Sequence, residues 1–184
     1  MRLSLLNFLC LLLTATPCVA ATLYMGSGET YTNLQAAMAA MEAGDTLVIR
    51  DGIYTGASNV ITRYECPPSS STTWTTIQAE TPGGVILDGE YARAPFSGLP
   101  PSSVNRHWVF DGIEFRNSDG VTVTLVRSDY VKFLRCGFVD STGASDTLYV
   151  GDCSYVLTED CYSYGNARYH FNFLASNHCI ARRC

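Results

Sequence analysis

Three consecutive side chains near the end of the chain suit acid–base chemistry on a charged ligand. Arg168, Tyr169 and His170 lie on an expected turn. There the arginine could bind a carboxylate, and the histidine or tyrosine could transfer a proton. The same residues also suit a turn whose histidine is hydrogen-bonded and whose tyrosine packs on the next coil. Both interpretations stay open, and Arg168 and His170 are candidate catalytic residues.

Lys132 is the only lysine of the chain and the third candidate, as a base. A lysine can accept a proton near neutral pH only where burial or nearby positive charge lowers its pKa.

Two acids offer a different chemistry. Asp111 and Glu159 fall two repeats apart in one expected column, roughly 10 Å from each other, near the upper limit for the carboxylates of an inverting glycosidase. Acids at this spacing also occur by chance on strands, so the pair is a minor alternative.

Other charged and metal-ligating side chains favour structure over chemistry. Arg135 and Arg183 flank Asp160 in one outward column, which predicts a salt-bridge ladder of modest stability. The three histidines and Cys179 form no paired zinc motif. Glu159 and Asp160 are neighbours on one strand and cannot converge on calcium. We therefore expect no metal and no cofactor within this stretch.

These residues belong to a repeat that fills the last third of the chain. Matching stretches begin at positions 108, 131, 156 and 179, in steps of 23, 25 and 23 residues. A second apolar pattern runs eight residues ahead, with columns made of Val123, Leu148 and Phe171 and of Leu125, Val150 and Phe173. Two short strands per period without a helix suit one coil of a parallel β-helix, in which each strand pairs with its counterpart one coil on, about 4.8 Å away.

Alternation along the strands assigns side chains to the inside or the outside of this solenoid. Lys132 and Leu157 are expected outside. Four residues of the same two strands are expected inside: Val131, Phe133, Val156 and Thr158.

Three cysteines recur at one position of the repeat, where the chain bends. Cys136, Cys161 and Cys184 follow Ile113 in a column that also points inward. We expect a structural role for them. They are either small apolar fillers of a stack or, in an exported chain, partners in disulfides.

The first 20 residues read as a secretory signal peptide. A positive start, a short apolar run and small residues at a cleavage site after Ala20 or Ala21 support this, and a retained anchor is a minor alternative. Removing this segment leaves 11 basic against 17 acidic residues and six cysteines. We expect a secreted or periplasmic protein that does not bind nucleic acid, because clustered positive charge is missing, and that is not stably inserted in a membrane after cleavage.

An amphipathic helix is predicted at about 33–43, ahead of the repeat. Thr32-Asn-Leu-Gln35 reads as a capping box, and Gly44 occupies the place of a left-handed C-cap residue. We expect this helix to cover the open apolar end of the first coil, because solenoids need caps.

Two segments resemble a known superfamily. The first runs from Tyr31 to Tyr54 and contains Leu34-Gln-Ala-Ala37, Ala43-Gly-Asp-Thr46 and Asp51-Gly-Ile-Tyr54. It resembles the N-terminal segment of secreted right-handed parallel β-helix proteins of the pectate-lyase-like superfamily. The second contains Ala79-Glu-Thr-Pro-Gly-Gly-Val85 and resembles the second coil of the chondroitinase B and alginate lyase family within it. With the later repeats, the superfamily resemblance covers nearly the whole of residues 21–184.

The resemblance implies an all-β, right-handed parallel β-helix and cleavage of an acidic polysaccharide by β-elimination. That reaction needs a base for the proton on C5 of a uronate, a cation or donor for its carboxylate and an acid for the leaving oxygen. In the family a lysine and an arginine on successive coils are the base and acid, beside a calcium ion held by Asn and Glu. Those positions belong to later coils, so no residue here takes a family role, and calcium is expected only in the complete protein.

Two insertions interrupt the coils, at residues 67–73 and 91–105. Long loops on a solenoid either wall a binding groove or merely decorate the surface, and both interpretations stay open.

Cys184 falls in mid-coil without a capping helix or polar terminal repeat, so we expect a chain truncated at its C-terminus that lacks the catalytic coils. Our functional hypothesis is the N-terminal part, residues 21–184, of a secreted monomeric polysaccharide lyase acting on uronate-containing polysaccharide. A non-catalytic β-helix that binds glycans or surfaces, and a glycoside hydrolase on the same scaffold, are the alternatives, because one fold serves many functions. Whether the chain is an enzyme at all stays open.

Overall fold

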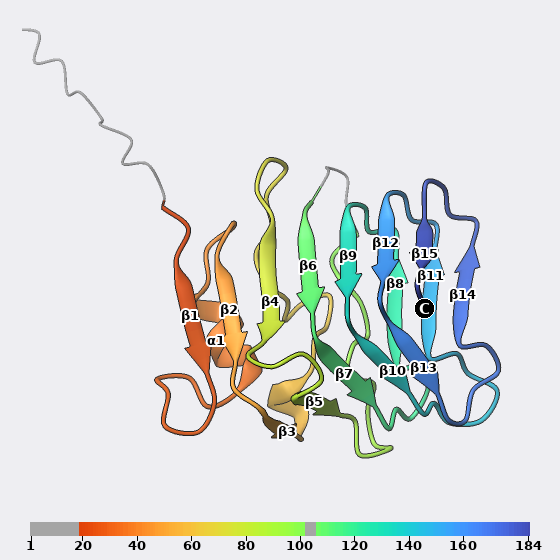
Figure 1. Ribbon diagram of the computed structural model, residues 1–184, viewed down its shortest axis with the longest axis horizontal. Helices are drawn as coiled ribbons and strands as arrows, with labels where there is room; N and C mark the ends of the chain where they lie inside the picture. The colour runs from red at the N-terminus through yellow and green to blue at the C-terminus, as the bar shows by residue number, and fades with distance from the viewer. Residues whose placement is uncertain (1–18, 102–105) are drawn as a thin grey trace, which may run out of the picture.

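The protein is a parallel β-solenoid, described by a computed structural model over residues 19–101 and 106–184. Figure 1 shows the strands of its largest sheet side by side along the long axis, in chain order from one end to the other. Every strand pair is parallel. The architecture is therefore that of a β-helix, as the repeat predicts.

Three sheets form the walls of the solenoid, and we call them A, B and C. Sheet A has seven strands: β1 (Thr22–Met25), β2 (Thr46–Ile49), β4 (Thr75–Ala79), β6 (Trp108–Asp111), β9 (Val131–Leu134), β12 (Val156–Glu159) and β15 (Ile180–Arg182). Sheet B has five strands: β3 (Gly52–Tyr54), β5 (Val85–Asp88), β7 (Ile113–Arg116), β10 (Gly137–Val139) and β13 (Tyr162–Tyr164). Sheet C has three strands: β8 (Val123–Val126), β11 (Leu148–Gly151) and β14 (Phe171–Leu174).

The predicted register is confirmed by the strand pairing. Val131 lies between Trp108 and Val156 in sheet A, and Leu148 lies between Val123 and Phe171 in sheet C. The four residues expected inside are buried, whereas Lys132 and Leu157 are only half-buried on the outer face. Alternation along each short strand therefore places the apolar side chains in one continuous core.

Aromatic rings stack on one another inside this core. Phe110 and Phe133 stack with their centroids 5.4 Å apart, and Phe115 and Phe138 stack at 6.3 Å. Phe96 packs edge-on against Phe110, Phe115 and Phe133 and is fully buried. Because equivalent residues recur one coil apart, like side chains contact like side chains along the axis.

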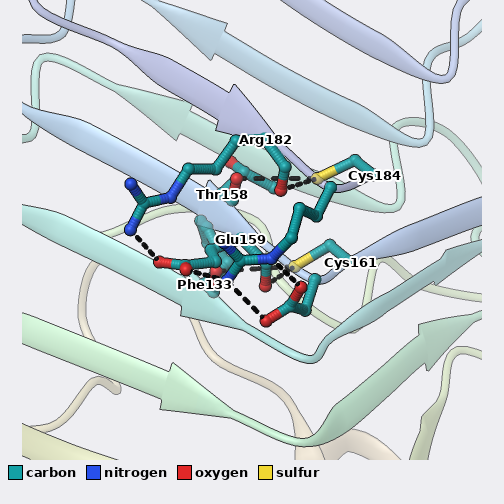
Figure 2. Close-up of polar contacts among 8 residues, drawn as sticks. Phe133, Thr158, Glu159, Cys161, Arg182 and Cys184 are labelled. Carbon is teal, nitrogen blue, oxygen red and sulfur yellow. Dashed lines mark hydrogen bonds and ion pairs between the residues drawn. The ribbon is translucent and has the colours of Figure 1, made fainter.

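The bend between sheets A and B is built by a left-handed residue followed by a cysteine. Arg135, Asp160 and Arg183 have φ between 53° and 54°, and Gly112 holds the equivalent place one coil earlier at 71°. The next residue is buried in the middle coils, and each thiol of this column has two carbonyl oxygens within hydrogen-bonding distance of its single proton. For Cys136 these oxygens belong to Phe110 and Leu134. Figure 2 shows the other two thiols, with Phe133 and Glu159 for Cys161 and with Thr158 and Arg182 for Cys184. The cysteines therefore satisfy carbonyl groups at the bend.

Every cysteine from Cys66 onward is a free thiol in the structure: Cys66, Cys136, Cys153, Cys161, Cys179 and Cys184. Cys136 and Cys161 are buried, as the inward column predicts, whereas Cys184 is exposed. Burial raises the pKa of Cys136 and raises that of Cys153 to about 11, which keeps both thiols protonated.

The N-terminal helix α1 (Leu34–Ala40) is shorter than predicted. Its N-cap is Asn33, whose side chain accepts a hydrogen bond from the Ala36 amide, so the expected capping by Thr32 was wrong. The helix ends before Met41 rather than at Gly44, because the following residues turn directly into β2. Its buried side chains join the core of the solenoid, and its role as a cap stays a prediction.

The predicted signal peptide lies almost wholly outside the described residues. Within residues 19–101 and 106–184, no helix has the length and apolar character needed to cross a membrane. The short 3₁₀-helix η1 (Ala57–Asn59) packs against α1, and its Asn59 side chain accepts a hydrogen bond from the Leu34 amide.

Two isolated bridges extend sheet C toward the N-terminus. Ile61 pairs with Phe96 and Phe96 pairs with Val123, both in parallel. The insertion at residues 91–105 therefore contributes one residue, Phe96, to the strand ladder of sheet C. As a result, Thr62 and Ser97 precede Thr124 in one outward column of sheet C.

Candidate functional site

The structure does not bring the three candidate catalytic residues together in one site. Lys132 lies on the outer face of sheet A, with its Nζ 3.9 Å from the centre of the Trp74 ring. That cation–π contact gives Lys132 a packing partner. Arg168 and His170 lie instead at the turn between sheets B and C.

Arg168 is held by a buried acid. Its Nε and Nη2 lie 3.0 and 3.1 Å from the two oxygens of Asp146, whose side chain is 1% exposed. The amide of Asn172 donates to the same carboxylate at 2.8 Å. Burial alone would raise the pKa of Asp146, but the bonds from Arg168 and Asn172 outweigh it and lower that pKa. The guanidinium is thus committed to Asp146.

His170 is exposed and takes part in a hydrogen-bond network at this turn. Its Nδ1 lies 2.9 Å from Ser163 Oγ, while Ser163 donates to the Phe138 carbonyl and Thr147 donates to the His170 carbonyl. The Thr147 and Ser163 hydroxyls also lie 2.7 Å apart, so Nδ1 donates to Ser163 or accepts from it according to the tautomer of His170. The contacts favour the hydrogen-bonded turn histidine over a catalytic one.

The carboxylates of sheet A are paired with arginines. Arg135 makes two bonds to Asp111, at 2.8 and 2.6 Å, and Arg182 contacts Glu159 at 2.8 Å from the adjacent strand (Figure 2). Hydrogen bonds from Arg182 lower the pKa of Glu159, whereas a glycosidase acid needs a raised pKa. Asp111 and Glu159 also flank Leu134 in their column, as the register predicts.

The predicted salt-bridge ladder is present with different partners. Arg183 contacts Asp160 at 2.6 Å, as expected, and also contacts Glu159. Arg135 turns toward Asp111 on the preceding strand, so its predicted pairing with Asp160 was wrong. A bidentate contact with the less exposed carboxylate is the better arrangement for a guanidinium.

Three arginines differ from the rest because no carboxylate lies within ion-pair distance of them. Among the described residues these are Arg63, Arg106 and Arg127. The remaining residues, 1–18 and 102–105, include no Asp or Glu. All three line hollows on the surface. In a chain with an excess of acidic residues, such free guanidinium groups mark places where an anion can bind.

Arg63 and Arg127 line one pocket of 320 Å³ on the outer face of sheet C. Thr124 and Val126 of β8 form its floor, and its wall is made of residues 97–99 and 101 of the second insertion. The interpretation that this insertion walls a groove therefore agrees with the structure. The first insertion contributes residues 67–71 to a separate hollow that contains Arg106.

The pocket continues into a neighbouring hollow along the same column. The second hollow is lined by Thr62, Arg63, Tyr64, Glu65 and Ser97, so Arg63 and Ser97 belong to both, and its carboxylate, Glu65, accepts a hydrogen bond from Gln35. We call the joined surface the sheet C groove. It combines two free guanidinium groups with the hydroxyl groups of Thr62, Ser97 and Thr124, a donor and acceptor set that suits a ligand carrying carboxylates and hydroxyls.

The sequence analysis did not single out Arg63 or Arg127. Arg63 lies before the regular repeat begins, and Phe96 joins the sheet C column at steps of 35 and 27 residues from Ile61 and Val123. A signal was present, since an apolar residue followed by Thr or Ser recurs in Ile61-Thr62, Phe96-Ser97 and Val123-Thr124.

The described residues contain no group of three or more His, Cys, Asp or Glu placed to hold a metal ion. Calcium in the complete protein stays an expectation from the resemblance.

Comparisons with known proteins give a limited result. No family model matches the chain, and no curated protein matches its sequence. Among solved structures, the chain is similar to the pectin methylesterase from Aspergillus niger, with a TM-score of 0.42 and 17% sequence identity over 91% of this chain and 60% of that one. The chain thus spans about 60% of the length of that enzyme.

Proposed function

We propose that the chain is part of a secreted carbohydrate-active β-helix protein that binds an acidic polysaccharide in the sheet C groove and serves its cleavage by β-elimination. The observation that carries the proposal is the pair Arg63 and Arg127, which have no carboxylate partner among residues 19–101 and 106–184 and face one pocket walled by an insertion. Guanidinium groups bind carboxylates through paired hydrogen bonds. A uronate unit supplies that carboxylate together with hydroxyls for Ser97 and Thr124.

The role of the two arginines in this chemistry is neutralisation of charge. Removal of the C5 proton of a uronate places negative charge on its carboxylate, and a fixed cation stabilises the charge as it develops. The pocket that holds Arg63 and Arg127 is lined, among the described residues, by no Lys, His, Asp or Glu that could act as the base, and Glu65 of the neighbouring hollow is hydrogen-bonded to Gln35. This part of the protein is therefore proposed to bind and orient the uronate, and the base is expected on other coils.

The test is binding of polygalacturonate to purified protein, with its fully methyl-esterified form as the neutral ligand. Arg63→Gln and Arg127→Gln should each weaken binding roughly tenfold, since a hydrogen bond to a charged group contributes about 1.5–3 kcal/mol. Binding should also fall with added salt. The matched control is Arg135→Gln, which removes one positive charge from the paired ladder of sheet A. Equal losses from all three variants would show attraction by overall charge and contradict a site at the groove.

A non-catalytic glycan-binding β-helix is the second candidate, favoured by the same lack of a base in the pocket. The two candidates differ in product. β-Elimination creates a conjugated double bond that absorbs ultraviolet light, whereas a binding protein leaves the ligand unchanged. The glycoside hydrolase alternative receives no support from Asp111 and Glu159, because both carboxylates are paired with arginines.

A further inference from the structure

The column that floors the sheet C groove continues beyond the pocket. Tyr149 pairs with Thr124 in the register and so lies on the next coil, about 4.8 Å along the axis. Asn172 follows Tyr149 one coil further on. The outward face of sheet C thus runs from the arginine pocket directly onto an aromatic ring.

The ring of Tyr149 lies along the sheet rather than upright. A Cβ added at Gly151 would lie 2.8 Å from both Cε1 and the hydroxyl oxygen of Tyr149, so the ring occupies the space that any larger side chain at Gly151 would fill. Gly151 has no other feature that requires glycine, because its φ is not in the left-handed region. The glycine therefore makes room for a ring laid flat on β11.

The next coil adjoins this ring with a fixed side chain. Asn172, the neighbour of Tyr149 in the register, donates to Asp146, which also holds Arg168. A tyrosine ring packed against its own strand offers an apolar face at little cost in conformational entropy.

We propose that Tyr149 is a stacking platform for a second sugar unit, next to the unit whose carboxylate binds Arg63 and Arg127. This inference rests on the proposed function and adds to it a preference for oligosaccharides over single sugars. The apolar face of a pyranose ring packs on the outward face of Tyr149, while its hydroxyls reach Asn172 and Thr124. The glycan would then run along the solenoid axis.

The chain offers a matched control on another wall. Tyr162 of β13 lies across Gly137 of the paired strand β10, and a Cβ added at Gly137 would lie 2.5 Å from its Cζ. Its hydroxyl donates to Glu114 at 2.7 Å, and the nearby Arg116 is paired with Asp88. Tyr162 is therefore also a tyrosine ring packed on a glycine, but it lies on sheet B, where the guanidinium is already neutralised.

The experiment measures affinity for galacturonic acid and for its oligomers of increasing length. Tyr149→Ala should weaken binding of the oligomers roughly tenfold and leave binding of the single sugar unchanged. Tyr149→Phe should bind like the wild type, because the ring is kept. Gly151→Ala should reproduce part of the loss by lifting the ring, and Tyr162→Ala should have no effect. Far-ultraviolet circular dichroism and thermal unfolding check that each variant is folded.

The outcomes separate the two proposals. If the wild type binds through Arg63 and Arg127 but Tyr149→Ala binds all lengths equally well, the stacking platform is refuted and the proposed function stands. A loss in Tyr149→Phe as large as in Tyr149→Ala assigns the effect to the hydroxyl and also overturns the platform. If neither galacturonic acid nor its oligomers bind the wild type at any length, the proposed function itself fails.

Discussion

The outer faces of sheets A and C use arginine in opposite ways. On sheet A, Arg135 and Arg182 each contact a carboxylate of an adjacent strand, so charge is neutralised along the stack. On sheet C, Arg63 and Arg127 have no such partner in the part of the chain that the structure describes, and an insertion folds beside them. The same side chain therefore joins coils on one face and is left available to a ligand on the other.

The difference shows how a solenoid separates stability from binding. Coils are joined by backbone ladders and inward columns, which every face shares. Outward side chains are then constrained only by their neighbours one coil away. A guanidinium bonded to an acid becomes part of the wall, whereas Arg63 and Arg127, which form no ion pair with any described residue, remain free for a ligand.

The largest expected effect comes from breaking the register that defines the two faces. Cys161→Arg places a charge at a position that is 3% exposed, so it should destabilise the fold by more than about 3 kcal/mol and abolish soluble expression. Leu157→Arg, on the outer face of the same coil, should cost about 1 kcal/mol or less. Soluble yield and thermal unfolding measure both. Normal expression of Cys161→Arg would mean that the assigned inward column is wrong.

A smaller effect tests the pairing of Arg168 with the buried Asp146. The pKa of Asp146 is lowered in the folded protein, so its ionised form contributes stability that is complete above the unfolded pKa near 4 and is lost as pH falls through the folded value. Asp146→Asn should lower stability by about 2 kcal/mol at neutral pH and reduce the loss of stability on acidification.

Denaturant unfolding between pH 7 and pH 3 measures this contribution. Asp152→Asn is a control for the general change in charge, because Asp152 is exposed. An unchanged acid dependence in Asp146→Asn would show that the carboxylate is not ionised through its bonds to Arg168.

The smallest effect is expected from the ladder of sheet A. Arg135 is 55% exposed, and its pairing with Asp111 should be worth only about 0.5 kcal/mol. Arg135→Gln should therefore shift the unfolding midpoint slightly, and a double-mutant cycle with Asp111→Asn should give a coupling of that size. A coupling as large as that of a buried pair would remove the contrast between the two faces.

The sequence predicts the fold well where coils are stacked. Val131, Phe133 and Cys136 were placed correctly because each has a counterpart one coil away, and the alternation of short strands leaves one choice of face. The first residue of α1 could not be predicted in the same way, because no repeat fixes it. Thr32 and Asn33 are both good N-cap residues, and the sequence does not say which amide the helix leaves free.

The candidate site was hidden because it depends on contacts outside the repeat. Phe96 enters sheet C through isolated bridges, and only this brings residues 97–101 beside β8. The chemistry that the sequence suggested for Arg168 was overridden by Asp146, a carboxylate 22 residues away that alternation alone does not place. Free and paired arginines look alike in a sequence, and only their neighbours in space distinguish them.

The stacked rings at the edge of sheet A have a spectroscopic consequence. Trp74, half-buried, meets His107 edge-on at 4.7 Å, and the row continues through Tyr130, whereas Trp108 is fully buried beneath it. These are the only two tryptophans of the chain, and Trp74 is partly exposed to water whereas Trp108 is shielded from it. Their emission should differ in wavelength, so intrinsic fluorescence can distinguish loosening of the outer row from melting of the interior without an added label.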